Sequence, residues 1–351
     1  MRSVQIDRLH EFSVKAMEAC GMAAADAHTV ADVLVETDVF GVATHGIKNL
    51  YGYAQKMQAG GLDAKARPVV ERQGTAWAMI NGNNAMGMVS ACEAMKLAIE
   101  KAGNAGIACV GVRNSCHFGA AGYYANMAAK AGMIGIAMSN ADPIMAVPGG
   151  CGVSIGSNPL SYAAPTGDGK SIFLDIALSN VAALKVIMAK EKGETLPEGC
   201  LVDAQGHPTT DPNTFPQESS LAPMGAHKGY GLAIMVELFS AVLTGAGMLS
   251  QVTSWNLDMA SPNNVGHFFI AVDIGQMMDM AEFKERMDWL GGQLHAAKRA
   301  AGIGRILMPG EMEWARHDAA LAGNCIELND ATTGNLEKLA AQFHLELPWQ
   351  I

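Results

Sequence analysis

The sequence predicts a layered α/β protein with a helical region at its N-terminus. The first 60 or so residues show helical periodicity, and short β-rich runs alternate with helical segments from residue 76 onward. Half of the 351 residues are hydrophobic and only 17% are charged, which provides a full core and excludes a disordered chain. At about 150 residues per domain, this length indicates about two domains.

The predicted elements follow one another in a regular order. The first helix covers residues 24–37, and Gly60-Gly61 and Pro68 mark the end of the helical region. The predicted strands are 76–80, 107–112, 133–138, 172–176 and 267–274. The predicted later helices are 90–102, 120–130, 229–244, 282–299 and 335–343.

Three segments between or within these elements have unusual composition. Residues 143–165 are rich in Gly, Pro, Ser and Asn, so we expect a long irregular and functional stretch. The proline-rich residues 191–216 predict a surface excursion. Residues 229–249 form the longest apolar run, but Glu237 and four glycines favour a buried core helix over a membrane span.

Charge and cysteine usage restrict the possible partners. Lys and Arg number 24 against 34 Asp and Glu, giving a formal net charge of −10 with no basic run, which argues against nucleic acid or a membrane surface. The seven cysteines are scattered and form no Cys-x-x-Cys pair, so neither a disulfide framework nor a metal site is expected. The N-terminus shows no secretory signal, and we therefore predict a cytoplasmic protein.

The familiar nucleotide-binding motifs are absent. The nearest match to a Rossmann fingerprint, Gly150-Cys151-Gly152 with Gly156, has the wrong spacing, and no Gly-Lys-Ser/Thr of a Walker A loop occurs. Any nucleotide must therefore be held by a less common scaffold.

Three glycine-flanked polar clusters could carry chemistry. In the first, Thr44-His45-Gly46, a hydroxyl beside an imidazole suits a proton donor, whereas the alternative is a helix C-terminus capped by Gly46. On residue chemistry alone, that alternative is favoured.

The second cluster, residues 114–122, lies between a strand and a helix, where anions and cofactors bind in layered α/β proteins. The alternative is a capping loop with a solvated His117, and the two interpretations are about equal. A Cys116–His117 nucleophile ranks low because adjacent residues rarely face each other.

The third cluster, residues 225–231, precedes the apolar helix, where Lys228 and the free N–H groups suit a phosphate or carboxylate. The alternative is ordinary helix-entry chemistry. Asp175, at the end of a predicted strand, could orient a catalytic histidine or merely cap a turn.

Together these clusters resemble the malate/L-lactate dehydrogenase family, which is unrelated to the Rossmann lactate and malate dehydrogenases. The resemblance covers about residues 6–330. Its markers are Thr44-His45-Gly46, His117-Phe118-Gly119-Ala120, Asn140-Ala141-Asp142-Pro143, Gly156-Ser157-Asn158-Pro159-Leu160, Asp175-Ile176-Ala177, His227-Lys228-Gly229-Tyr230-Gly231-Leu232 and Met308-Pro309-Gly310-Glu311. Each marker is weak, but seven in the right order are specific.

The resemblance implies a sulfolactate-dehydrogenase-like fold rather than a Rossmann fold. Residues 1–65 would form a helical domain completed by about 285–351, and residues 66–284 a mixed α/β NAD(P)-binding domain with a mixed or antiparallel sheet. Members are homodimers with the active site near the subunit contact.

The implied activity is hydride transfer with NAD or NADP between a 2-hydroxy acid and a 2-oxo acid, with a malate-, lactate-, ureidoglycolate- or sulfolactate-like substrate. The acid/base falls on His45, assisted by Thr44 and Asp175, although some members assign this role to the histidine at His117. The implied cofactor contacts are His117, Phe118, Gly119, Ala120, Ala121, Ala141, Asp175, Ile176, Ala177, Lys228, Gly229, Gly310 and Glu311.

The sequence departs from the family where relatives bind the substrate carboxylate. The arginine expected there is Asn49, and a second arginine is replaced by Phe40. Either Lys48 or another cation substitutes, or the substrate is not a simple 2-oxo acid. A reductase of cyclic imino acids and a catalytically silent dimeric cofactor-binding protein stay open as alternatives.

Overall fold

The computed structural model describes residues 1–350 and has a mixed α/β fold, as predicted. The main sheet consists of β2 (Val69–Gln73), β3 (Trp77–Asn81), β4 (Ile107–Ser115), β13 (Val265–Asp273), β5 (Met133–Ser139), β8 (Leu160–Pro165) and β9 (Ser171–Ile176), in that spatial order. Strands β3 and β4 are parallel and the other neighbours are antiparallel, so the sheet is mixed.

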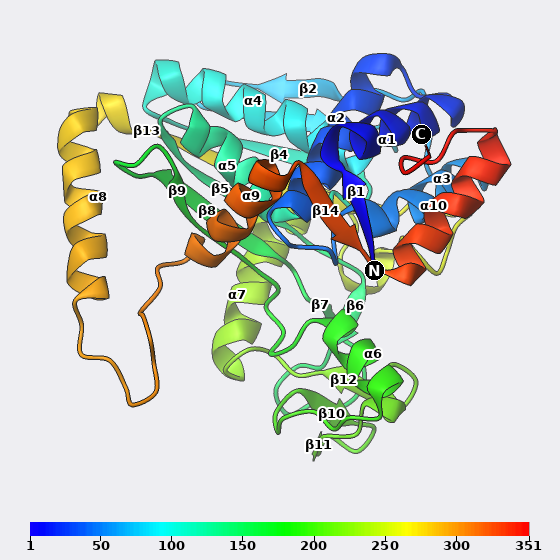
Figure 1. Ribbon diagram of the computed structural model, residues 1–351. Helices are drawn as coiled ribbons and strands as arrows, with labels where there is room; N and C mark the ends of the chain where they lie inside the picture. The colour runs from blue at the N-terminus through cyan, green and yellow to red at the C-terminus, as the bar shows by residue number, and fades with distance from the viewer. Residues whose placement is uncertain (351) are drawn as a thin grey trace.

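Helices cover both faces of the main sheet (Figure 1). On one face lie α4 (Gly87–Ala105) and α5 (Ala121–Lys130), and on the other lie α7 (His227–Glu237) and the π-helical turn Leu238–Val242. Alternate side chains of each strand point to opposite faces. In β4, accordingly, Val110 packs into the core under α4, whereas Cys109 packs against the core beside α7.

The two ends of the chain meet in a helical region. Strand β1 (Arg2–Gln5) pairs antiparallel with β14 (Cys325–Leu328), and α10 (Asp330–Phe343) packs against α1 (Ile6–Ala19) and α3 (Leu50–Gln58). Helix α2 (Ala24–Val39) joins them, with α9 (Glu311–Gly323) beside it. The division of the chain near residues 65 and 285 stays a prediction.

A smaller sheet extends from the body below α7 (Figure 1). Its strands are β11 (Pro208–Thr209), β10 (Leu201–Asp203), β12 (Ser219–Leu221), β6 (Pro143–Met145) and β7 (Ile155–Gly156). Helix α6 (Ala183–Lys192) packs beside it around buried Val186. The excursion predicted at residues 191–216 therefore contains two short strands, and Leu201 and Phe215 are buried there.

The expectation that residues 143–165 are irregular is wrong. They contain β6 and β7 of the small sheet and β8, which pairs with β5 on one side and with β9 on the other. The Gly and Pro content belongs mainly to the turns between these strands. Pairing on both sides stabilises β8 although its sequence has weak β propensity, because tertiary context outweighs propensity.

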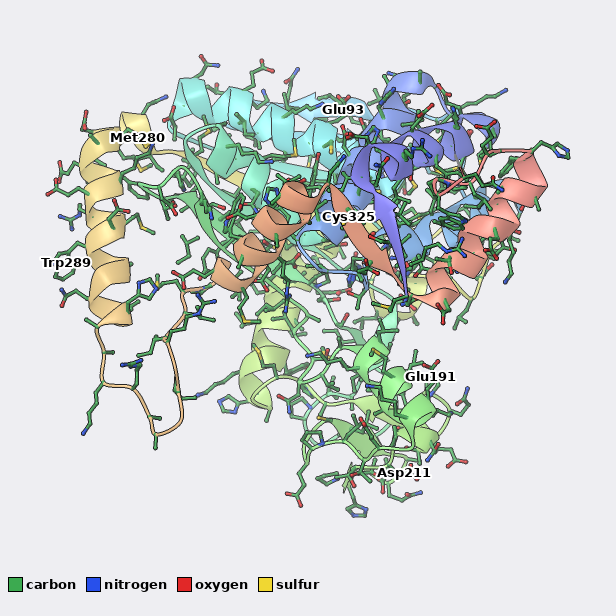
Figure 2. The ribbon with its side chains drawn as sticks, viewed as in Figure 1. Glu93, Glu191, Asp211, Met280, Trp289 and Cys325 are labelled. Carbon is green, nitrogen blue, oxygen red and sulfur yellow. The ribbon has the colours of Figure 1, made fainter. Side chains whose placement is uncertain are left out.

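The expected buried helix at 229–244 is also only partly correct. Its inner side packs closely, since a Cβ on Gly266 of β13 would lie 1.7 Å from the Ser240 carbonyl oxygen. Its outer side is bare in the single chain, where Leu238, Val242 and Leu243 are 51%, 54% and 59% exposed. Helix α8 (Met280–His295) likewise stands apart from the body and has no buried residue, and its Trp289 points outward (Figure 2).

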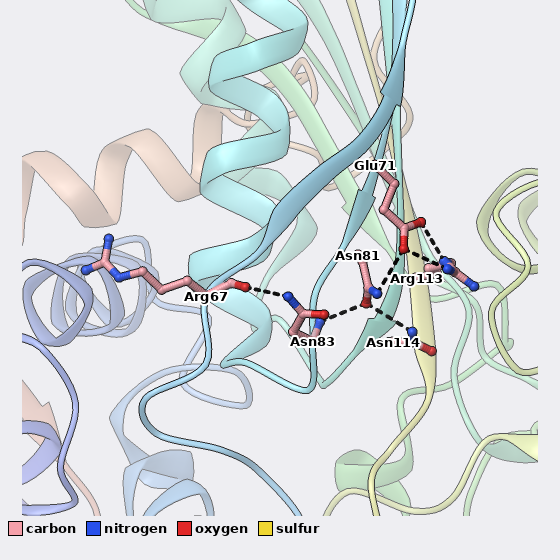
Figure 3. Close-up of polar contacts among 6 residues, drawn as sticks. All are labelled: Arg67, Glu71, Asn81, Asn83, Arg113 and Asn114. Atoms are coloured by element: carbon pink, nitrogen blue, oxygen red, sulfur yellow. Dashed lines mark hydrogen bonds and ion pairs between the residues drawn. The ribbon is translucent and has the colours of Figure 1, made fainter.

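A polar network fixes the sheet edge from which one of the predicted site loops departs (Figure 3). Arg113 of β4 donates two hydrogen bonds to Glu71 of β2, at 2.7 and 3.0 Å. The Asn81 amide also donates to Glu71, and its oxygen accepts from the backbone N–H of Asn83 and the side chain of Asn114. The network therefore holds the end of β4, immediately before the loop that contains His117.

Candidate active site

The first predicted cluster lies in a connection and not at a helix C-terminus. Helix α2 ends at Val39, and His45 follows six residues later, before the 3₁₀ turn Ile47–Asn49. The Thr44 hydroxyl lies 2.7 Å from His45 Nδ1. The expected pairing of the hydroxyl with the imidazole is therefore present, and the cap interpretation is wrong.

The buried side chains of Asp38 and Asn49 support the loop that carries His45. Asp38, near the end of α2, accepts the backbone N–H of Ile47 at 2.7 Å. A Cβ on Gly46 would lie 2.3 Å from the Asp38 carboxylate, so only glycine fits between them. Asn49 is buried and donates from its amide to the Thr44 carbonyl at 3.1 Å. The residue expected to contact substrate thus supports the loop that carries His45.

The second cluster brings His117 against the same loop. The rings of His45 and His117 stack at 5.6 Å with 20° between their planes, and Trp255 stacks on His117 at 4.6 Å. The His117 backbone N–H donates to Asn263 Oδ1 at 3.0 Å. Helix α5 begins only at Ala121, and the residue before it, Ala120, has no capping side chain, so a capping loop with a solvated histidine does not describe this segment.

Two groups approach His117 Nδ1 and fix the ring's tautomer. The Tyr53 hydroxyl lies 2.5 Å from it, and the Gly119 backbone N–H donates to it at 3.4 Å. Because the Gly119 group can only donate, Nδ1 acts as acceptor and Tyr53 donates as well. A neutral His117 therefore carries its proton on Nε2.

Burial shifts the titration of all the groups at this centre. Burial and the charge of Lys48 lower the pKa of His45 from 6.5 to about 4. Burial also lowers the pKa of His117 well below its usual value, with His45 and His267 adding to the effect. Burial raises the pKa of Asp38 to about 6 against the effect of the Ile47 N–H. Both site histidines are thus neutral near pH 7.

A cavity of about 400 Å³ lies beside the histidine loops. Its walls come from the end of α2, the start of α5, strand β9 and residues 307–313. Val42 and Ala120, on the two histidine-bearing segments, line it together with Asp175 and Gly310. Three predicted cofactor contacts, Ala120, Asp175 and Gly310, therefore meet at one cavity although they lie far apart in the sequence.

Asp175 is not paired with either site histidine. Its carboxylate accepts the Gly122 backbone N–H at the start of α5, at 2.7 Å, and burial raises its pKa to about 6. The predicted assistance to His45 thus has no direct contact behind it in the single chain. Asp175 instead belongs to the wall of the cavity.

The third cluster lies close to the end of β9. The Met224 backbone N–H donates to the Leu178 carbonyl at 2.9 Å, and a Cβ on Gly229 would lie 2.9 Å from the same oxygen. This packing sets the start of α7, with exposed Lys228, beside Ile176 and Ala177. Ala141 lies elsewhere, against Asn158, whose side-chain oxygen accepts its N–H.

Two residues near the site are structural. Cys116 is fully buried and its pKa is raised to about 12, so it is a thiol and not a nucleophile. His267 lies between the Ser115 and Ser139 hydroxyls, stacked on Phe118.

Among residues 1–350, no group of three or more His, Cys, Asp or Glu side chains is arranged to hold a metal ion. No helix in this part of the chain has the length and apolar character needed to span a membrane.

The sequence-based analysis missed Tyr53, Trp255, Asn263 and Asp38. Only Asp38 gave a local signal, because an acidic residue in the last turn of a helix opposes the helix dipole and so calls for a special reason. Trp255 and Asn263 come from a segment distant in the sequence from both histidines, and Tyr53 lies 64 residues from the histidine that it contacts, His117.

A model of the malate/L-lactate dehydrogenase family matches residues 4–337. The chain belongs to this family. It is 38% identical over 312 residues to the malate dehydrogenase of Pyrococcus abyssi, covering 87% of this chain and 85% of that protein. The family is one of oxidoreductases that act on the CH–OH group of hydroxy acids.

Solved structures in the family share the fold. The sulfolactate dehydrogenase of Methanocaldococcus jannaschii superposes with a TM-score of 0.92 at 32% identity, covering 99% of this chain and 98% of that one. The Δ1-piperideine-2-carboxylate reductase of Pseudomonas syringae pv. tomato has a TM-score of 0.87 at 29% identity, covering 97% and 100%. The predicted sulfolactate-dehydrogenase-like fold is therefore confirmed.

Proposed function

We propose that the protein is a nicotinamide-dependent dehydrogenase that interconverts a 2-hydroxy acid and a 2-oxo acid, with His45 as the acid/base. The observation that carries the proposal is the Thr44–His45 pair at 2.7 Å, beside a cavity lined by predicted cofactor contacts, in a member of this family. The hydroxyl engages Nδ1, so Nε2 of His45 is free to exchange a proton with the substrate oxygen.

The residues around the cavity fit a nicotinamide dinucleotide. The walls are mainly apolar, which suits the faces of a nucleotide base. Lys228 is exposed at the start of α7 and can add a cation. When bound, the cofactor supplies or accepts the hydride, and the protein positions the reactants and moves one proton.

His117 has a different role in this proposal. Its Nε2–H is held in one orientation by Tyr53, Gly119 and the stacked Trp255. A neutral imidazole N–H can donate a hydrogen bond to the substrate carbonyl or to the cofactor without itself changing charge.

Lys48 is the cation we propose for the substrate carboxylate. Lys48 is partly buried and follows His45 by three residues, and its charge lowers the pKa of His45, which supports an ammonium within electrostatic reach of the acid/base. Asn49 offers no charge to a carboxylate, and one of its two amide N–H groups is already bonded to the Thr44 carbonyl. A lysine provides the charge without the bidentate geometry of arginine.

Reduction of a cyclic imino acid is the second candidate. The similarity to the piperideine-2-carboxylate reductase over 97% of this chain supports it. The same proton donor would serve an imine nitrogen in place of a carbonyl oxygen.

We also propose a cytoplasmic homodimer, formed through the bare apolar surfaces of the single chain. The outer side of α7 and its π-helical turn exposes Leu238, Val242 and Leu243, and α8 exposes Trp289. Apolar surface of this extent indicates a protein partner, and a second copy satisfies both surfaces by symmetry. Light scattering of the purified protein tests the assembly.

The activity is tested by following NADH and NADPH oxidation with a panel of substrates. The panel contains oxaloacetate, pyruvate, a sulfonated 2-oxo acid and a cyclic imino acid, each 2-oxo acid paired with its uncharged amide. We expect turnover of a 2-oxo acid and its loss with the amide. Turnover of the imine alone would favour the second candidate, and binding of cofactor without any turnover would show a catalytically silent protein.

A further inference from the structure

Lys56 of α3 is the one fully buried lysine of residues 1–350. Its amino group donates hydrogen bonds to two backbone carbonyls, that of Asp258 at 2.6 Å and that of Ser261 at 2.8 Å. Within the same residues it forms no ion pair. Because a buried lysine without a carboxylate partner is costly, its two bonds call for a reason beyond packing.

The two carbonyls belong to the loop of residues 253–263, which lies between the 3₁₀ turn Leu249–Gln251 and β13. This 253–263 loop packs closely against the chain just after α3. A Cβ on Gly61 would lie 2.2 Å from the Met259 carbonyl oxygen and 2.8 Å from that of Ser261. Lys56 and Gly61 therefore hold the loop at neighbouring points of its backbone.

The same loop carries two side chains that contact His117. The ring of Trp255 stacks on His117 at 4.6 Å, and Asn263 Oδ1 accepts the His117 backbone N–H at 3.0 Å. The Asn263 amide also donates to the Thr253 carbonyl, which joins the two ends of the loop. A shift of the loop away from α3 would therefore reach both contacts with His117.

We propose that Lys56 is a positioning residue for His117 that acts through the 253–263 loop. The inference rests on the proposed function, in which the fixed Nε2–H of His117 donates to the substrate or the cofactor. Helix α3 then holds this ring in two ways, directly through the Tyr53 hydroxyl at Nδ1 and indirectly through Lys56. Removal of the amino group leaves two buried carbonyls without their donor, which favours separation of the loop from α3.

Two variants displace the loop in different ways. Lys56→Met keeps an unbranched side chain and removes the donors, and Lys96→Met is its control because Lys96 is an exposed lysine of another helix, α4. Gly61→Ala pushes against the loop carbonyls while Lys56 stays in place. Gly292→Ala is the control for it, since a Cβ on Gly292 has no atom within 4 Å.

Hydrogen exchange of the full-length protein, followed by mass spectrometry, reports on the His117 backbone N–H that donates to Asn263. We expect peptides covering the 253–263 loop and His117 to exchange at least about tenfold faster in Lys56→Met and in Gly61→Ala than in wild type. Strand β5, paired on both sides in the main sheet, should keep its wild-type rate. Both control variants should match the wild type throughout.

Steady-state kinetics with the best substrate of the panel provides the second readout. We expect kcat of Lys56→Met to fall by about tenfold, with KM for the nucleotide within about threefold of wild type, because the loss concerns orientation of His117 and not binding. Unchanged exchange at His117, or a normal kcat in both variants, would overturn the inference. Equally faster exchange in β5 would also overturn it, because Lys56 would then only stabilise the fold.

Gly61→Ala keeps the test decisive if Lys56→Met is too unstable to purify. Faster exchange at His117 in Gly61→Ala would support the loop as the link to the ring, and unchanged exchange there would overturn it. The proposed function is tested separately by the wild type. Absence of wild-type turnover with every member of the panel would overturn that function, whereas hydrogen exchange would still decide whether Lys56 holds His117.

Discussion

His45 and His117 stack against each other, yet the segments around them leave their imidazole rings different freedom. His117 has two N–H or O–H donors at Nδ1 and a tryptophan on its face, so its tautomer and orientation are fixed. The one hydrogen-bonding partner of the His45 imidazole in residues 1–350 is the Thr44 hydroxyl, which can donate or accept. A ring whose partner can reverse its role is better suited to gain and lose a proton.

The support beneath the rings differs as well. The His45 loop depends on a buried carboxylate and on close contact at a glycine, whereas the His117 loop is held by a tyrosine, an amide and the polar network at the sheet edge. Four substitutions test this difference between the two loops.

The largest effect should come from Gly46→Ala. The new methyl would lie 2.3 Å from the Asp38 carboxylate, so the loop must move away from α2. We expect turnover to fall by about a hundredfold or more, because a displacement of about 1 Å misplaces the acid/base. Gly334→Ala is the control, since a Cβ there has no atom within 4 Å. Near-normal turnover in Gly46→Ala would mean that the Asp38 brace has no role.

Asp38→Asn should change the pH dependence of stability. The folded pKa of Asp38 is about 6 against a usual 3.8, so the folded chain binds this proton more tightly than the unfolded chain does. The stability contributed is fully present below about pH 4 and is lost as the pH rises through about 6.

In the Asp38→Asn variant this loss of stability at higher pH is absent, because asparagine does not ionise. Its side-chain oxygen can still accept the Ile47 N–H. The free energy of unfolding of the variant, relative to the wild type, should therefore rise by about 1–3 kcal/mol between pH 4 and pH 7. Urea unfolding at several pH values measures it. If the free energy of unfolding depended on pH in the same way in both proteins, the raised pKa of Asp38 would be contradicted.

Tyr53→Phe should lower kcat by about tenfold, because one charge-neutral hydrogen bond that fixes His117 is lost while the Gly119 N–H stays in place. Tyr51→Phe, on the same helix, is the control and should behave as wild type. If His117 acts only as a fixed hydrogen-bond donor, kcat of Tyr53→Phe should fall without a change in its pH profile. A shifted profile would show that His117 itself titrates during turnover.

Thr44→Val should have the smallest effect, a loss of about fivefold to tenfold in kcat. The valine keeps the shape of threonine and removes the hydroxyl that orients His45. Thr44→Ser should restore activity because it restores the hydroxyl. Equal losses in both variants would indicate that the methyl group, and not the hydrogen bond, positions the ring.

Much of the fold could be predicted because its signals are local. The alternation from β3 through α4, β4 and α5 to β5 agrees with the predicted order, since these segments show clear periodicity and turn residues. Strand β8 was not predicted, because its own sequence favours a strand only weakly. It is stabilised by pairing with β5, which precedes it in the chain, and with β9, which follows it. The apolar run of α7 predicted burial correctly for one side only, because sequence does not say which partner covers the other.

The same distinction between local sequence signals and long-range contacts applies to the site. Thr44, His45 and His117 stand in short motifs, and the structure brings them together. Tyr53 lies 64 residues from His117 and Asn263 lies 146 residues from it, so no local pattern could pair them. The position of Asn49 was predictable but its contact was not, because the Thr44 carbonyl becomes its acceptor only once the loop has folded.

Proton exchange by His45 is tested by single-turnover NADH oxidation in His45→Ala, with the NADH affinity of the same variant measured in parallel. We expect a rate lowered by about a hundredfold or more between pH 6 and pH 8, with the dissociation constant of NADH within about twofold of wild type. A His45→Ala protein that reacts at the wild-type rate, while His117→Ala does not react at all, would contradict this role of His45 and assign the proton transfer to His117.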